Sequence, residues 1–198
     1  MNVAATEEPV LSESAWLGRC RAGDRAAWRW LYDRYFPRVY RLALRLGAHE
    51  REAGDVCQEV FLRVFRSLAS FRGEAQFSTW LYRIVMNEAA RVRRAGGLRR
   101  TLASLLGRQP EEPPPLRPDQ RAEQSEAFHE LEAVLGRMKP KQRDVFVLYE
   151  LEELGLPEIA AIVGCGAETA KSRLRLARAE FERLRRQRAF VVIAGGKP

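Results

Sequence analysis

The sequence has very few of the residues that build metal sites. Its 198 residues include only three cysteines and two histidines. Cys20, Cys57 and Cys165 lie far apart and form no CxxC pair, and only His49 and His129 could join them in a cluster. The sequence therefore predicts no metal site.

Long apolar runs are also absent. No stretch approaches the roughly 20 apolar residues that a membrane-spanning helix needs. Residues 1–14 lack both the basic start and the apolar middle of a signal peptide. We therefore expect a cytoplasmic protein with no direct membrane insertion.

Catalytic motifs are missing as well. The glycine-rich turn before Lys171 resembles a phosphate loop at first sight, but Cys165 and Ala170 stand where that loop requires glycine. We find no metal-ligand spacing and no nucleophile beside a histidine in the sequence. We therefore expect a protein that is not an enzyme and that takes no cofactor.

What the sequence does contain is an excess of positive charge. Lysine and arginine number 34 against 26 aspartates and glutamates, which gives a net charge of +8 and a pI near 9.9. This sign favours polyanionic partners, because cationic side chains release the counterions of a phosphate backbone. The 46% hydrophobic content can build one core of moderate size or two small ones. Nucleic acid is the first candidate partner.

Helical periodicity runs through most of the chain and stops at a proline-rich stretch. Residues 95–125 hold five of the ten prolines and predict a linker. The segments expected to be helical before it are 12–22, 24–46, 50–69 and 78–94, and about four more follow it. No segment alternates convincingly as a strand would. The sequence therefore predicts an all-α fold of two small helical domains joined by a proline-rich linker.

The segment 24–46 carries clear helix boundaries. Its apolar residues recur at steps of three or four: Trp28, Leu31, Tyr35, Val39, Leu42 and Leu46. Asp24 fits an N-cap, and Gly47 fits a C-terminal stop. Pro37 falls inside the pattern, so we expect it to kink or interrupt the helix.

The C-terminal block contains a helix-turn-helix pattern in residues 156–186. Pro157 suits the first position of one helix, and Gly164 and Gly166 supply the turn to the next. The second helix has an apolar stripe of Ala170, Leu174, Ala177, Phe181 and Leu184. A solvated amphipathic helix is the alternative, but the glycine-rich turn and a cationic outer face occur together. We interpret the second helix as one that enters the major groove of double-stranded DNA.

The segment 50–69 has an exposed face of mixed character. Its buried stripe is Val56, Val60, Val64 and Leu68. The other side combines charged and polar side chains with one leucine: Asp55, Gln58, Glu59, Leu62 and Arg66. Such a face is usually a solvated one, and spacing alone leaves that interpretation open.

Four stretches of the chain agree in order and spacing with one protein family. They are AGDRAAWRWLYDRYFPRVYRLA, DVCQEVFLRVFRSLASF, FSTWLYRIVMNEAARVRR and MKPKQRDVFVLYELEELGLPEIAAIVGCGAETAKSRLRLAR. Over about residues 15–187 the chain resembles the sigma-70 family, specifically its extracytoplasmic-function (ECF) group. The resemblance implies region 2 in residues 1–94, a flexible linker in 95–125, region 4 in 126–188 and a tail in 189–198. The role of this short apolar tail stays open.

The resemblance implies a docking site for core RNA polymerase. The DxxQExF motif of the family docks on the clamp helices of the largest polymerase subunit. The matching residues here are Asp55, Gln58, Glu59 and Phe61, followed by Leu62. Asp55 and Glu59 would face basic residues of the clamp.

The resemblance also implies two contacts with promoter DNA. A loop and helix around residues 71–87 would melt the minus-ten element and capture a flipped base, for which aromatic and cationic side chains are suited. The candidates for minus-ten DNA are Phe77, Trp80, Tyr82, Arg83, Asn87, Arg91 and Arg94. A core position is the alternative for Phe77 and Trp80.

The helix-turn-helix would bind the minus-thirty-five element in the major groove. The candidates are Glu168, Thr169, Lys171, Ser172, Arg173, Arg175 and Arg178. First-turn residues would lie near base edges, and Arg173 and Arg178 are better placed for phosphates. Gly166, Glu168 and Ala170 depart from the residues common in the family, which leaves the preferred bases open.

The implied function is a dissociable initiation subunit that recognises and melts a promoter without covalent chemistry, under control of an anti-sigma protein. A stand-alone helix-turn-helix regulator is the rival hypothesis, and it would bind DNA without polymerase. The 31 linker residues extend to about 100 Å at most and average roughly 30 Å as a flexible coil. Promoter elements about 18 base pairs apart are separated by roughly 60 Å. We therefore expect a compact or flexible free protein, whose domains polymerase holds apart.

Overall fold

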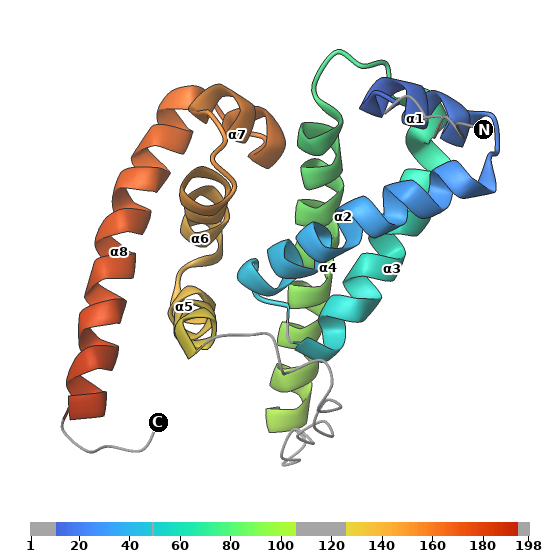
Figure 1. The fold of residues 1–198 in the computed structure, drawn as a ribbon. Helices are drawn as coiled ribbons and strands as arrows, with labels where there is room; N and C mark the ends of the chain where they lie inside the picture. The colour runs from blue at the N-terminus through green and yellow to red at the C-terminus, as the bar shows by residue number, and fades with distance from the viewer. Residues whose placement is uncertain (1–10, 49, 106–125, 194–198) are drawn as a thin grey trace, which may run out of the picture.

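The structure is a computed structural model that describes residues 11–48, 50–105 and 126–193. Every regular element in these ranges is helical, as the sequence predicts. The elements are α1 (Glu13–Arg21), α2 (Arg25–Arg45), α3 (Glu50–Ser67), the 3-10 turn η1 (Leu68–Ser70), α4 (Phe77–Leu105), α5 (Glu126–Arg137), α6 (Pro140–Phe146), the π-helical turn η3 (Val147–Leu151), α7 (Leu156–Val163) and α8 (Ala167–Ile193). Helices α1 to α4 and α5 to α8 form two helical domains (Figure 1).

Helix α2 begins and ends where the sequence predicts. The Asp24 carboxylate caps it and accepts hydrogen bonds from the backbone N–H groups of Ala26 and Ala27 at 2.8 and 3.3 Å. Gly47 follows its last turn with a φ of +86°, a left-handed conformation that glycine adopts without strain.

Pro37 lies inside α2 and does not interrupt it, contrary to one of the two outcomes that the sequence suggests. Proline removes one hydrogen bond from a helix interior and crowds the preceding turn. Here the turns on both sides of Pro37 are fixed by burial, through Leu31, Tyr35, Val39 and Leu42. Tertiary packing of this kind outweighs the local preference for a break.

The predicted stripe of α3 faces the core of the N-terminal domain. Val56, Val60, Val64 and Leu68 are each 1% exposed or less. They pack against α2 and α4, with which α3 makes its main contacts. Its opposite side remains available at the surface.

Helices α3 and α4 are also joined by a buried carboxylate. Glu88 of α4 is 1% exposed. Its Oε1 forms an ion pair with Arg63 Nε of α3 at 2.5 Å, and its Oε2 accepts a hydrogen bond from Arg91 Nε at 2.7 Å. These two arginines compensate a charge that would be costly to bury alone.

The C-terminal domain contains the predicted helix-turn-helix, α7 and α8. Gly164 ends α7 in the left-handed conformation, with a φ of +66°. The predicted stripe of α8 is buried at Ala170, Leu174, Ala177 and Leu184. Its fifth member, Phe181, stacks on Phe146 of α6 with ring centroids 4.6 Å apart.

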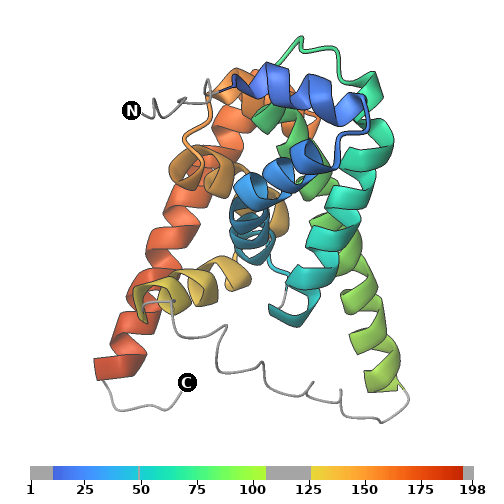
Figure 2. The same ribbon diagram turned by 45° about the vertical axis from the view of Figure 1, so that its right-hand side comes forward.

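The two domains pack directly against each other. Helix α4 contacts α7, and α2 contacts α5. Figures 1 and 2 show α3 on the side of α2 and α4 that faces away from the C-terminal helices. The C-terminal domain thus covers one face of the N-terminal domain and leaves its other face open.

Two helices extend beyond the ends that the sequence predicts. Helix α4 continues from Arg94 to Leu105, through Gly96 and Gly97. Glycine disfavours a helix by only about 1 kcal/mol, and leucine, arginine and alanine favour it on both sides. Helix α8 continues to Ile193, into the predicted tail. Residues 106–125 of the predicted linker and 194–198 of the tail lie outside the described residues.

Candidate functional site

An open apolar groove lies between α2 and α3. We call it the docking groove, and its apolar wall consists of Trp28, Tyr32, Phe36, Phe61, Leu62 and Phe65. Its volume is about 1090 Å³. Tyr32, Leu62 and Phe65 are 44%, 38% and 62% exposed, which is unusual for side chains of this size. Grouped exposed apolar side chains indicate a surface that another protein covers.

The aromatic rings of the groove hold one another in place. Phe61 lies 4.7 Å from Tyr32, and Trp28 lies 4.9 Å from Phe65, between ring centroids. Tyr32 also stacks on Phe36 at 5.0 Å. Rings in such tilted and stacked pairs have few alternative orientations, so a partner would meet a surface that is already shaped.

The structure brings the five predicted polymerase-binding residues together on one side of α3. Asp55, Gln58 and Leu62 are exposed, while Glu59 and Phe61 are partly buried. Gln58, Phe61 and Leu62 line the docking groove. The two acidic residues lie on the same helix, so a partner of this face needs both apolar and basic groups.

Sequence analysis missed the contribution of α2 to this groove. Tyr32, Phe36 and Tyr40 recur every four residues, which places them on one side of the helix beside the buried stripe. Trp28 was predicted to belong to that buried stripe, but it lines the groove and is only partly buried. The sequence of α2 therefore carries two adjacent apolar rows, the buried stripe and the row of Tyr32, Phe36 and Tyr40. The second row was the signal that could have identified the groove.

The predicted minus-ten residues of α4 fall into a buried and an exposed group. Phe77 and Tyr82 are 2% and 1% exposed, and Trp80 is partly buried. Phe77 packs against the rings of Tyr35 and Phe71, with centroids 5.1 and 5.7 Å away. These positions fit the core interpretation that the sequence left open for Phe77.

The exposed group consists of Arg83, Asn87, Arg91 and Arg94. Arg83, Asn87 and Arg94 follow one side of α4, at spacings of four and seven. Arg91 is held by Glu88, which accepts its hydrogen bond and raises the pKa of its guanidinium. The structure therefore offers a cationic strip along α4, whose role in DNA binding stays a prediction.

The predicted minus-thirty-five residues gather at the start of α8. Glu168, Thr169, Lys171, Ser172, Arg175 and Arg178 are exposed, and Arg173 is partly buried. Arg178 donates to Glu150 Oε1 at 2.6 Å and lies over the ring of Tyr149. A turn-and-helix surface with this density of cations suits the major groove and the flanking phosphates.

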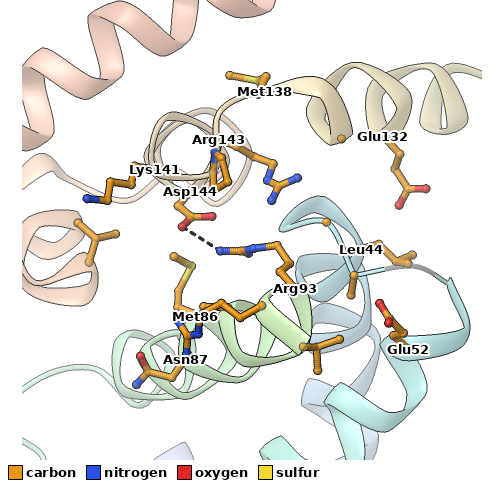
Figure 3. Close-up of a pocket in the computed structure, with 18 of the residues that line it drawn as sticks. Leu44, Glu52, Met86, Asn87, Arg93, Glu132, Met138, Lys141, Arg143 and Asp144 are labelled. Atoms are coloured by element: carbon orange, nitrogen blue, oxygen red, sulfur yellow. Dashed lines mark hydrogen bonds and ion pairs between the residues drawn. The ribbon is translucent and has the colours of Figure 1, made fainter. Parts of the chain in front are cut away.

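A cleft of about 1140 Å³ separates α4 from the C-terminal domain at one end of the contact. Figure 3 shows Arg93 of α4 reaching Asp144 of α6, with an Nη2 to Oδ2 distance of 3.3 Å. Asn87 and Arg94 also line this cleft. Burial, together with repulsion from Arg93, lowers the pKa of the neighbouring Arg143 guanidinium to about 10.

Nowhere in residues 11–48, 50–105 or 126–193 do three histidine, cysteine or acidic side chains gather closely enough to hold a metal ion. None of the helices described there combines the length and hydropathy that crossing a bilayer requires.

Two family models match the chain. The model of sigma-70 region 2 matches residues 31–99, and that of sigma-70 region 4 matches residues 128–181. The first match covers most of α2, all of α3 and most of α4, and the second covers most of α5, all of α6 and α7 and the first part of α8. The two matches thus fall on the two domains of the structure.

Curated relatives and a solved structure agree with these matches. The chain is 37% identical over 164 residues to the ECF RNA polymerase sigma factor SigE of Mycolicibacterium smegmatis, covering 80% of this chain and 63% of the relative. It is 33% identical over 179 residues to the ECF RNA polymerase sigma-E factor of Haemophilus influenzae, covering 87% and 94%. The sigma factor RpoE of Bartonella quintana, solved with the anti-sigma factor NepR, superposes with a TM-score of 0.63 at 22% identity, covering 79% and 94%. That last similarity concerns the fold.

Proposed function

Because the chain belongs to the sigma-70 family of RNA polymerase sigma factors, in its ECF group, we propose that it is a dissociable subunit that directs promoter-specific initiation. In this proposal it binds core RNA polymerase through α3, reads minus-thirty-five DNA with α8 and melts the minus-ten element with α4. It performs no covalent chemistry and acts in the cytoplasm. Region 2 occupies residues 1–94 and region 4 residues 126–188, with a linker between them and a tail after them.

The observation that carries this proposal is the open docking groove. It combines three exposed apolar side chains, Tyr32, Leu62 and Phe65, with the motif residues Gln58 and Phe61. A regulator that acts alone would need no such surface on the side away from its DNA-binding helix. The clamp helices of the largest polymerase subunit are the partner that we assign to the groove.

Co-elution with core polymerase tests the proposal. Purified protein mixed with core enzyme should elute as a complex and start transcripts at defined sites on promoter DNA. Tight binding to a palindromic duplex without polymerase, and no complex with core enzyme, would instead favour the stand-alone regulator. A start-site map from cells that overexpress the protein would then give the promoter bases.

Charge reversal at Glu59 should weaken the complex with core polymerase. Glu59→Lys places a cation where we expect basic groups of the clamp, so affinity should fall roughly tenfold. Fluorescence anisotropy of labelled protein titrated with core enzyme measures the loss.

Glu182→Lys is the matched control for that substitution. Glu182 is an exposed glutamate of α8 that forms ion pairs with Arg185 and Arg186 of the same helix. Its reversal makes the same change in net charge and should leave the affinity for core enzyme unchanged. Equal losses in both variants would show a general charge effect and would remove Glu59 from the docking site.

Arg175 should matter for promoter recognition and not for polymerase binding. Arg175→Ala removes an exposed cation from the first turns of α8, and a lost base contact costs about 1 to 3 kcal/mol. Initiation from a promoter with its minus-thirty-five element should therefore fall about tenfold or more, measured by run-off transcription. Arg185→Ala, farther along the same helix, should keep initiation near the normal level. If Arg175→Ala lost core binding as well, a folding defect would explain the result.

We also propose control by an anti-sigma protein. The solved structure of the Bartonella quintana sigma factor contains an anti-sigma factor, and the fold of that protein is similar to the fold of this chain. The docking groove is an apolar surface that such an inhibitor could cover in competition with polymerase. Competition between an anti-sigma protein and core enzyme for the labelled chain would support this assignment.

A further inference from the structure

One buried carboxylate of the C-terminal domain forms ion pairs with two arginines of the N-terminal domain. Glu152 follows the π-helical turn, and its side chain is 4% exposed. Its Oε2 accepts from Arg38 Nε at 3.0 Å and from Tyr82 Oη at 2.8 Å, and its Oε1 accepts from Arg45 Nη1 at 3.0 Å. Both oxygens are thus held by groups from the other domain, as the oxygens of a bound phosphate would be.

A second carboxylate of the C-terminal domain, that of Asp144 in α6, is also paired with an arginine of the N-terminal domain. Asp144 Oδ2 accepts a hydrogen bond from Nη2 of Arg93. The other terminal nitrogen of Arg93, Nη1, donates to the carbonyl of Leu46 at 2.6 Å. Arg38, Arg45 and Arg93 therefore form a row of cations on the face that α2 and α4 share. We call them the arginine row, and we call Glu152 and Asp144 the interdomain carboxylates.

The arginine row borders the cationic strip of α4 that carries the predicted minus-ten residues. Tyr82 and Arg93 lie on one side of α4, and Arg83 and Arg94 lie about a quarter turn away. Arg83 is also engaged by the C-terminal domain, since its Nη2 donates to the carbonyl of Ala161 at 2.8 Å. A DNA strand that followed the strip would bring its phosphates within reach of the row.

The C-terminal domain leaves the docking groove free while it covers this face. The groove is lined by residues of α2 and α3, and Figures 1 and 2 show α3 on the side of α2 and α4 away from the C-terminal helices. The free chain can therefore present its groove to a protein partner while the guanidinium groups of the arginine row remain paired with the interdomain carboxylates.

We propose that the arginine row is a binding site for DNA phosphates, which the interdomain carboxylates of the C-terminal domain occupy in the free chain. Opening of the domain contact exchanges carboxylate for phosphate on the same guanidinium groups. This inference rests on the proposed function, and it adds Arg38 and Arg45 to the DNA-binding surface.

Substitutions at Glu152 test whether the carboxylate keeps the chain closed. Its side chain contacts Arg38, Arg45 and Tyr82 of the other domain, so its loss should leave the C-terminal fold intact. Small-angle scattering should show a larger radius of gyration for Glu152→Gln, and a larger one still for Glu152→Lys. An unchanged radius in both variants would overturn the closure.

Oligonucleotide binding tests the second half of the proposal. The probe is a fluorescein-labelled thymidine oligonucleotide of about 20 nucleotides, titrated with the full chain at several salt concentrations. If the closed form predominates, Glu152→Gln should tighten binding by about tenfold, because the competent fraction rises. An opened chain with unchanged affinity would overturn the phosphate site.

Substitutions in the row identify the cations that bind. Arg38→Met with Arg45→Met, in the Glu152→Gln background, should abolish the gain while the chain stays open. The slope of log affinity against log salt should fall by about 0.7 for each arginine removed. Arg41→Met is the matched control, because Arg41 is an exposed arginine between them on α2. An equal loss for Arg41→Met would overturn the assignment to the row.

Core polymerase binding separates this inference from the function on which it rests. Glu152→Gln leaves the docking groove untouched, so it should co-elute with core enzyme as the unsubstituted chain does. If neither protein bound core enzyme, the proposed function would fail, whereas the scattering and oligonucleotide results would still decide whether the row binds phosphates.

Discussion

Leu62→Asp should almost abolish binding to core RNA polymerase. Leu62 is 38% exposed and lines the docking groove together with Phe61 and Phe65. Covered by a partner, an aspartate at this position would lose its hydration against the aromatic rings of the groove, which costs free energy. Losses at central interface positions reach about 2 to 4 kcal/mol, or roughly 30- to 1000-fold in affinity. Anisotropy titration with core enzyme measures the change.

Two further variants show that the loss comes from the groove. Leu62→Met keeps an apolar side chain of similar volume and should bind core enzyme within a few-fold of normal. Ala69→Asp adds the same charge at an exposed site in η1, outside the groove, and should bind normally. Retained binding by Leu62→Asp, with its fold intact, would show that polymerase docks elsewhere on the chain.

Phe77→Ala should destabilise the N-terminal domain by about 3 to 5 kcal/mol. Truncation of a buried phenylalanine removes transfer free energy and leaves a cavity. Phe77 is 2% exposed and packs against the rings of Tyr35, Phe71 and Trp80. Urea unfolding followed by tryptophan fluorescence should show the domain unfolding at a much lower midpoint.

Arg83→Ala gives the contrasting result for a residue from the same predicted set. Arg83 is exposed, so the free energy of unfolding of the Arg83→Ala variant should differ from that of the unsubstituted protein by less than about 1 kcal/mol. Promoter melting, measured by permanganate footprinting, should instead decline. A Phe77→Ala variant that unfolded normally but failed to melt promoter DNA would contradict the core position of Phe77 and support a base contact.

Most of the predictions that rested on local sequence patterns were confirmed by the structure. The caps at Asp24 and Gly47, the valine stripe of α3 and the helix-turn-helix each depend on neighbours within a few turns, and each is present in the structure. Pro37 shows where a local rule fails, because buried side chains on both sides of it hold α2 together.

The candidate sites were predicted less completely than the fold. They depend on contacts between residues far apart in the chain, and such contacts produce no periodic pattern in the sequence. The contact between Arg38 and Glu152 joins residues 114 positions apart. Tyr82 donates to that same Glu152 at 2.8 Å, a contact that could not be foreseen from its place on α4. The docking groove needed two helices, and only α3 carried a motif that drew attention to it.

The buried Glu88 links mechanically the helix that would seat on polymerase and the helix that would open the promoter. Arg63 belongs to α3, and both Glu88 and Arg91 belong to α4. If α3 slid along α4, Glu88 would lose one of its two arginines while remaining buried. We therefore expect α3 and α4 to move together as one rigid unit. The orientation in which α3 binds polymerase would then determine the position of α4. A change in the angle between the two domains would leave this cluster undisturbed, because Arg63, Glu88 and Arg91 all belong to the N-terminal domain.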